Sequence, residues 1–128
     1  MNLLLDTHAF IWWAQGSDRL STAASEAIAD PQNVVFVSSA VIWEIVIKVE
    51  MGKLDFDDPV DTTVDEQCLL NGFRRLAIEH RHVHALRGLP YHHKDPFDRI
   101  LMAQAIADEL TLVTTDPLFA KYPVSTLW

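Results

Sequence analysis

Short strand-like segments alternate with helix-compatible stretches along this chain, and this alternation constrains the fold more than any other feature of the sequence. The segments are residues 2–5, 34–37, 74–78 and 111–114, with 124–127 as a fifth candidate. Residues 34–37, VVFV, show no polar alternation, which is typical of a strand buried on both faces. Because strands that alternate with helices form βαβ units, the sequence predicts an α/β fold with a central parallel sheet covered on both sides.

The stretches between these segments carry residues that begin and end helices. Ser21 is a favoured N-cap, and Ser38 and Ser39 precede a long apolar helix that Gly52 closes. Helices are therefore expected over residues 7–15, 20–29, 40–51, 63–70, 79–88 and 97–109, with an acidic loop over 55–61.

Composition fits one ordinary globular domain. The chain has 128 residues, of which 49% are hydrophobic and 22% are charged, and this length is near the commonest domain size. Cys68 is the only cysteine, which excludes a disulfide framework and is typical of a reducing cytoplasm. The leading apolar run is too short for a signal peptide or a membrane span.

The net charge of -8 is the opposite of the usual electrostatic signature of a nucleic-acid-binding protein. Acids spread over the surface confer solubility, whereas acids that converge in a pocket bind cations, so their positions matter more than their number. The chain lacks the GxGxxG, GxxxxGKS/T and GxSxG motifs of dinucleotide, P-loop and serine-hydrolase sites. An aspartyl phosphatase usually carries a second aspartate two residues after the first, and here that position is His8.

Carboxylates follow two of the predicted strands. In parallel sheets, sites form outside the carboxyl ends of the strands, so residues at these ends converge along one edge. Asp6 comes directly after residues 2–5, and Asp116 comes shortly after residues 111–114. Each has a simpler interpretation: Asp6 as an N-cap worth about 1 kcal/mol, and Asp116, before Pro117, as the start of a turn. Both interpretations stay open at this point.

Two predicted helices add further acids near the same edge. Glu44 and Lys48 interrupt an otherwise apolar helix, either as a solvent-facing i, i+4 pair or as a polar stripe that faces a cleft. Asp95 is placed to cap the helix that Pro96 begins, whereas Asp98 falls at the third helical position, where an acid complements the helix dipole. A helix start needs one acid and this one has two, which leaves Asp98 available as a ligand.

Asp6, Glu44, Asp98 and Asp116 thus come from separate segments that the predicted topology places along one edge. Clustered carboxylates repel one another unless cations neutralise them, and oxygen ligands suit Mg²⁺ or Mn²⁺. The six histidines show no ligand set at zinc spacing, so they are expected at surface or loop positions.

Four longer blocks, LLLDTHAFIWW, VSSAVIWEIVIKVEMGKL, HHKDPFDRILMAQA and LTLVTTDPLFAKYPV, occur in an order and spacing that resemble one known family. The chain resembles the PIN-domain ribonucleases of the VapC type, the toxin half of a bacterial or archaeal toxin–antitoxin pair. Asp6, Glu44, Asp98 and Asp116 fall on the acidic metal-site positions of this family. Asp95 falls on an extra acid of the DPFDR subgroup, and Thr115 lies where the family often has a small hydroxyl residue.

The resemblance implies a three-layer α/β/α sandwich with four to five parallel strands, formed by one nuclease domain over residues 1–128. It also implies Mg²⁺- or Mn²⁺-dependent endoribonuclease activity on RNA, a homodimer and a VapB-like antitoxin. The single cysteine and the short apolar run lead us to expect a cytoplasmic location and no membrane partner. Lys48 and Arg99, each beside a proposed ligand, are expected either to contact substrate phosphate or to pair with Glu44 and Asp98. A catalytically silent PIN-fold binding module is the alternative, and the intact acidic set argues against it.

Overall fold

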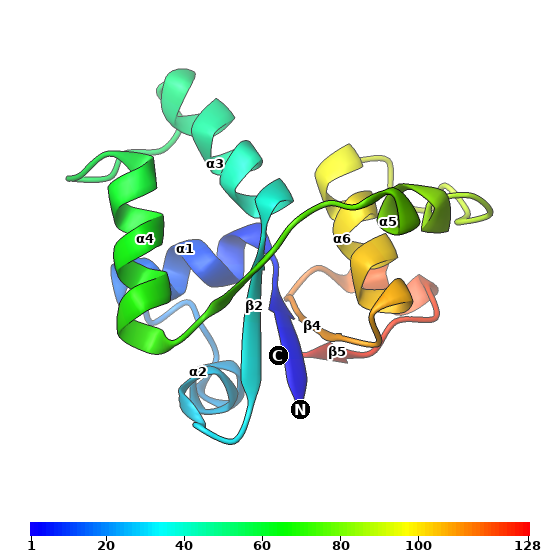
Figure 1. Cartoon of the computed structure of the whole chain (residues 1–128), viewed down its shortest axis with the longest axis horizontal. Helices are drawn as coiled ribbons and strands as arrows, with labels where there is room; N and C mark the ends of the chain where they lie inside the picture. Colours follow the sequence, from blue (N-terminus) through cyan, green and yellow to red (C-terminus); the bar gives the residue numbers. More distant parts are fainter.

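A computed structural model describes all residues, 1–128, and its centre is a five-stranded parallel sheet with strand order β3-β2-β1-β4-β5 (Figure 1). The strands are β1 Asn2–Leu5, β2 Val34–Ser38, β3 Arg74–Leu76, β4 Thr111–Val113 and β5 Thr126–Leu127. Every neighbouring pair in the sheet runs parallel. The predicted parallel sheet is confirmed, and the fifth candidate strand is part of it.

Helices cover both faces of the sheet. They are α1 Thr7–Gln15, α2 Thr22–Ala29, α3 Ser39–Glu50, α4 Val60–Asn71, α5 His80–Ala85 and α6 Pro96–Ala107, followed by the short 3-10 helix η1 Pro117–Lys121. Helices α1, α2 and α4 lie on one side of β1 and β2, and α5 and α6 lie on the other (Figure 1). This arrangement confirms the expected three-layer α/β/α sandwich.

Buried strands and capped helices explain why this sequence takes this fold. Leu3, Leu4 and Leu5 are all fully buried, because helices cover both faces of the central strand β1. Asp6 caps α1 by accepting the Ala9 N–H, and Ser21 caps α2, as expected. No helix is both long and apolar enough to span a bilayer.

Several element boundaries differ from the sequence-based expectation, and three of them have a clear physical reason. Helix α4 begins at Val60, three residues early, because Asp61 in its first turn complements the helix dipole. Strand β3 ends at Leu76 instead of residue 78 and is an edge strand whose Arg74 and Arg75 are exposed. Helix α6 ends at Ala107 rather than residue 109, where the left-handed backbone of Glu109 (φ 54°) turns the chain.

The strand order marks the carboxyl end of β1 as the expected place for a site. From β1 the chain builds outward through β2 and β3, then returns to the other side of β1 with β4 and β5. The strand order therefore reverses between β1 and β4, and open α/β sheets bind ligands outside the carboxyl ends of the strands at such a point. Asp6 follows β1 and Thr114 follows β4, and the two residues lie side by side because the Asp6 N–H donates to the Val113 carbonyl at 3.1 Å.

Candidate functional site

Asp6 is a helix cap and also a buried carboxylate at the carboxyl end of β1. Its Oδ1 accepts the Ala9 N–H at 2.8 Å, and the residue is 5% exposed. Burial raises the pKa of Asp6 above its ordinary value, and hydrogen bonds from the Thr114 side chain and the Ala9 N–H oppose the rise. Asp6 is therefore confirmed as a helix cap. It is also a carboxylate whose burial disfavours its ionised form.

Glu44 lies on α3 and is oriented by two neighbours. The Thr7 hydroxyl donates to Glu44 Oε1 at 2.6 Å, and Lys48 Nζ lies 3.3 Å from Oε2. Lys48 therefore takes the pairing role that was one of its two expected roles. The negative charge of Glu44 raises the pKa values of both Asp6 and Asp98, which places these three carboxylates within electrostatic reach of one another.

Asp98 is a carboxyl group of the site whose ionised form is strongly disfavoured. Burial is the largest cause of a rise in its pKa from 3.8 to about 7, and the charges of Asp95, Glu44 and Asp6 raise it further. His93 acts in the opposite direction and lowers the pKa of Asp98. A carboxyl group with this pKa is only partly ionised at neutral pH, and a bound cation would favour its charged form.

Asp95 has a different local role from Asp98, as the sequence indicated. Its Oδ1 accepts the N–H groups of Phe97 and Asp98 at 2.8 and 3.1 Å. Pro96 occupies the first helical position after it. Asp95 thus caps α6, whereas the Asp98 carboxylate takes no part in the cap and contacts His93.

Asp116 lies in the turn between β4 and η1 and reaches the site from there. Its Oδ1 accepts the Leu118 N–H at 2.9 Å and so begins η1, while its Oδ2 lies 2.9 Å from His93 Nε2. The same nitrogen of His93 lies 3.0 Å from Asp98 Oδ2. One ligand atom from each of these three residues falls within 4.8 Å of the others. We call Asp6, Glu44, Asp98 and Asp116 the acidic cluster.

The expectation of surface or loop histidines is wrong for His82 and is met for His93 by its place on a loop, although His93 is buried there. His93 is 8% exposed, on the loop before α6, and His82 on α5 is fully buried. His82 Nδ1 accepts the Glu79 N–H at 3.0 Å, and its Nε2 lies 2.9 Å from Asp108 Oδ2. Each imidazole accepts a hydrogen bond from a nearby backbone N–H and contacts a carboxylate 26 residues away for His82 and 23 residues away for His93. Zinc-ligand spacing does not report contacts of this kind.

Arg99 has neither of the roles expected of it. Its guanidinium is buried and donates to the carbonyls of Leu89, Pro90 and His93 at 3.1, 2.9 and 3.2 Å. It also lies 3.9 Å from the centre of the Tyr91 ring. Arg99 therefore anchors the loop before α6 and is not available to a substrate phosphate or to Asp98.

The hydroxyl groups at the site belong to Thr7 and Thr114, whereas Thr115 is exposed. The Thr114 Oγ1 accepts the Asp116 N–H at 3.1 Å, and its hydroxyl bonds to Asp6, so it links two members of the acidic cluster. Thr7, Thr114 and His93 were missed by the sequence reasoning. For Thr7 there was a signal, because it directly follows Asp6 on the strand-to-helix turn.

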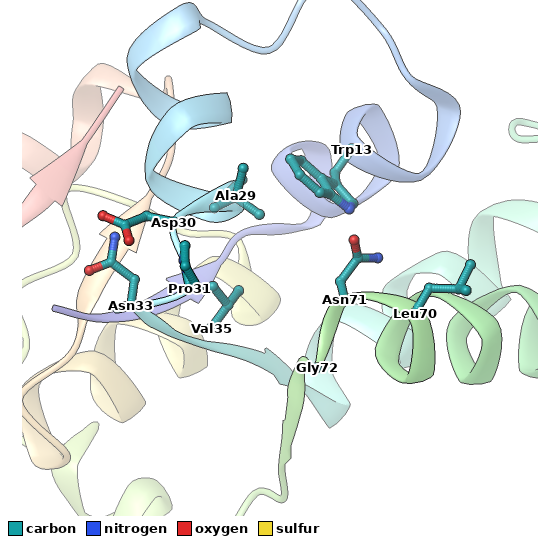
Figure 2. A pocket seen from close by; sticks show the side chains of 10 residues that line it. Trp13, Ala29, Asp30, Pro31, Asn33, Val35, Leu70, Asn71 and Gly72 are labelled. Carbon is teal, nitrogen blue, oxygen red and sulfur yellow. The ribbon is translucent and has the colours of Figure 1, made fainter.

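The largest hollow of the molecule is elsewhere. It measures about 490 Å³ and lies between α1, α2 and α4, where Trp13, Asn33 and Asn71 face it (Figure 2). Asn33 directly precedes β2 and Gly72 lies two residues before β3, so this hollow is at the amino ends of these strands. Asp30 is the only carboxylate in its lining, so this hollow has no counterpart of the acidic cluster at the carboxyl ends of the strands.

The chemistry of the acidic cluster suits a hard divalent cation. Its ligand atoms are carboxylate oxygens, and the basic side chains in direct contact with them are Lys48 and His93. Two of the carboxylates have raised pKa values, so their ionised forms are insufficiently stabilised by the protein alone. Oxygen ligands of this kind match the preferences of Mg²⁺ and Mn²⁺.

The chain is similar to known proteins over most of its length. The family model of the PIN domain matches residues 3–124. The chain is 32% identical over 116 residues to Ribonuclease VapC22 of Mycobacterium tuberculosis, covering 89% of this chain and 86% of that protein.

Solved structures share the fold at low sequence identity. The structure of VapBC2 from Rickettsia felis, bound to a DNA fragment from their promoter, aligns with a TM-score of 0.74 and 19% identity over 100% of this chain and 99% of that one. VapC20 of M. tuberculosis, a Sarcin-Ricin loop cleaving toxin, aligns with a TM-score of 0.65 and 15% identity over 95% of each chain.

Proposed function

Because this chain belongs to the PIN domain family, we propose that it is the ribonuclease toxin of a toxin–antitoxin pair and cleaves RNA with Mg²⁺ or Mn²⁺ held by the acidic cluster. Its similarity to a protein named as a VapC ribonuclease extends over 89% of the chain. The observation that carries the proposal is the convergence of side chains at this edge, where one atom each of His93, Asp98 and Asp116 lies within 4.8 Å of the others. Burial and the charges of neighbouring carboxylates also raise the pKa of Asp98 to about 7. Such an arrangement is costly unless a cation completes it.

The residues of the site would divide the work of holding the cation. Asp6, Glu44, Asp98 and Asp116 supply the oxygen ligands. Thr7 and Thr114 donate hydrogen bonds that fix the orientation of Glu44 and Asp6. A bound divalent cation supplies a Lewis acid that activates water and offsets the charge that develops on the phosphate.

Lys48 is the better candidate of the two basic residues for contact with RNA. Its side chain is 29% exposed and pairs with Glu44 at the edge of the site, whereas Arg99 is enclosed by backbone carbonyls. The ammonium group of Lys48 could therefore orient a phosphate without rearrangement of the fold. A cation in the cluster would also make this acidic edge attractive to phosphate, which reconciles an RNA substrate with the net charge of -8.

The proposal includes a VapB-like antitoxin and a toxin homodimer. Several similar structures are described as VapBC or toxin–antitoxin complexes, including one from Klebsiella pneumoniae. An arginine of the antitoxin would suit the acidic cluster, because a guanidinium can replace the cation charge and bind carboxylates bidentately. Co-expression with the antitoxin should then restore growth that the toxin alone suppresses, and replacing every arginine in its toxin-binding segment should abolish inhibition.

The direct test is cleavage of RNA by the purified protein with Mg²⁺, with Mn²⁺ and with EDTA. We expect cleavage with either cation, none in EDTA, and none with Asp98→Asn at an unchanged circular dichroism spectrum. Asp58→Asn is the matched control, since it makes the same chemical change at an exposed position of the acidic loop. Undiminished cleavage by Asp98→Asn would refute the site, and no cleavage by any protein would favour a silent binding module.

A further inference from the structure

The imidazole of His93 contacts the carboxylate groups of two members of the acidic cluster through a single nitrogen. Its Nε2 lies 2.9 Å from Asp116 Oδ2 and 3.0 Å from Asp98 Oδ2. These aspartates come from different parts of the chain: Asp98 from the first turn of α6 and Asp116 from the turn after β4. We propose that His93 is a positioning residue whose Nε2–H holds Asp98 and Asp116 together, so that both carboxylates meet one cation.

The loop that carries His93 is fixed from several directions. The His93 N–H donates to the Tyr122 hydroxyl at 2.7 Å, and the His93 carbonyl accepts from Arg99 at 3.2 Å. The Tyr122 hydroxyl in turn donates to the Pro90 carbonyl at 2.7 Å. The His93 ring packs against Phe119, with the ring centres 5.5 Å apart. A ring held this firmly can act as a fixed reference point for the two carboxylates.

The hydrogen bond at the other ring nitrogen decides which nitrogen carries the proton. The Asp95 N–H donates to His93 Nδ1 at 3.3 Å, so Nδ1 is an acceptor and Nε2 bears the hydrogen. An Nε2 that carries a proton donates to carboxylates and cannot at the same time bind a metal. This contact therefore favours a positioning role over direct ligation.

The role has a clear physical consequence for metal affinity. The two Oδ2 atoms of Asp98 and Asp116 share one N–H dipole, which offsets their mutual repulsion before a cation arrives. Hydrogen bonds of this kind orient carboxylate ligands, and their removal typically lowers metal affinity about 10–100-fold. Asp116 depends on the contact more, because its side chain is 32% exposed whereas that of Asp98 is 23% exposed.

This inference rests on the proposed metal site, and it is tested by binding rather than by cleavage. Mn²⁺ is titrated calorimetrically into the wild-type protein and into His93→Leu, His93→Gln and His92→Leu. Leucine fills the space without a donor, while the glutamine amide restores an N–H near the Nε2 position. His92 is the matched control, because it is the adjacent histidine and is exposed. Each variant is first checked for native circular dichroism.

We expect His93→Leu to weaken Mn²⁺ binding about 10–100-fold, His93→Gln to recover most of the affinity, and His92→Leu to match the wild type. Equal affinity for wild type and His93→Leu would overturn the inference and leave the proposed function standing. No Mn²⁺ binding by the wild type would overturn both. Equal losses in His93→Gln and His93→Leu would overturn the positioning role and indicate direct ligation.

A second measurement needs only the wild-type protein and is therefore independent of whether the variants fold. Long-range ¹H–¹⁵N correlation spectra of the metal-free protein report which imidazole nitrogen bears the proton. We expect the Nε2–H tautomer for His93, and an Nδ1–H tautomer would overturn the inference. In pulsed electron paramagnetic resonance of the Mn²⁺-loaded protein, we expect no ¹⁴N coupling of a directly bound imidazole, and its detection would equally overturn the inference.

Discussion

Replacement of Asp98 by asparagine is expected to stabilise the metal-free protein at pH 8. The Asp98 pKa is about 7 in the folded protein, against 3.8 as its ordinary value. Between these pH values the native state holds a proton that the unfolded chain has released, so the free energy of unfolding falls as pH rises. Below pH 3.8 this effect is absent, and above about pH 7 the full cost is present.

The size of the effect follows from the same shift. A pKa that rises from 3.8 to about 7 corresponds to at most about 4 kcal/mol. The Asp98 side chain is 23% exposed, so solvent screening reduces this value. Asparagine also gives up a helix-dipole interaction worth about 0.3–1 kcal/mol. We expect Asp98→Asn to gain about 1–3 kcal/mol at pH 8, which corresponds to a Tm higher by about 4–12 °C.

Thermal unfolding followed by circular dichroism in EDTA, from pH 5 to pH 8.5, measures this directly. The wild-type Tm should fall across the range relative to that of Asp98→Asn, while Asp58→Asn should follow the wild type. Saturating Mn²⁺ should reverse the order, because a ligand that binds only the native state stabilises it by mass action. If Asp98→Asn melts below the wild type at pH 8 in EDTA, Asp98 is not under the electrostatic conflict inferred here.

Other substitutions separate the structural from the proposed chemical roles of the site residues. Asp6→Asn keeps a capping oxygen but loses the charge, so it should melt at or above wild type in EDTA and gain less from Mn²⁺; equal Mn²⁺ shifts would make Asp6 only a cap. Asp95→Ala should lose about 0.5–2 kcal/mol of stability and less cleavage activity than Asp98→Ala, and the reverse order of activity would exchange their roles. Thr7→Val removes the hydroxyl that orients Glu44 and should therefore weaken Mn²⁺ binding. An unchanged affinity for Mn²⁺ would contradict this role of Thr7.

The elements that were predicted correctly are those specified by neighbouring residues. The caps at Asp6, Ser21 and Asp95 act within three residues of themselves, so the starts of α1, α2 and α6 were visible in the sequence. Strand β1 was equally clear, because an apolar run buried on both faces has no other common interpretation. Strand β3 was predicted too long because, as an edge strand, it carries little of the apolar signal.

The convergence of the acids was predictable in outline, since the topology places strand ends together. The structure brings Asp6, Glu44 and Asp98 within electrostatic reach and connects Asp116 through His93. Their service as metal ligands stays a prediction.

The roles of His93 and Arg99 could not be predicted, because they depend on how a loop packs against distant residues. The Tyr122 hydroxyl, which fixes this loop, lies 29 residues beyond His93 and 32 beyond Pro90. No local pattern encodes such contacts. The burial of both side chains follows from packing across the molecule. For this reason Arg99 anchors a loop, whereas the sequence suggested that it could contact a phosphate.

The most direct test of the metal site is an anomalous difference map from a crystal of the protein grown with Mn²⁺. Diffraction measured on both sides of the manganese absorption edge locates the cation without assumptions about its ligands. We predict a peak at the carboxyl ends of β1 and β4, bounded by the carboxylates of Asp6, Glu44 and Asp98. A map with manganese peaks only at other surface carboxylates, or none at all at saturating Mn²⁺, would contradict this account.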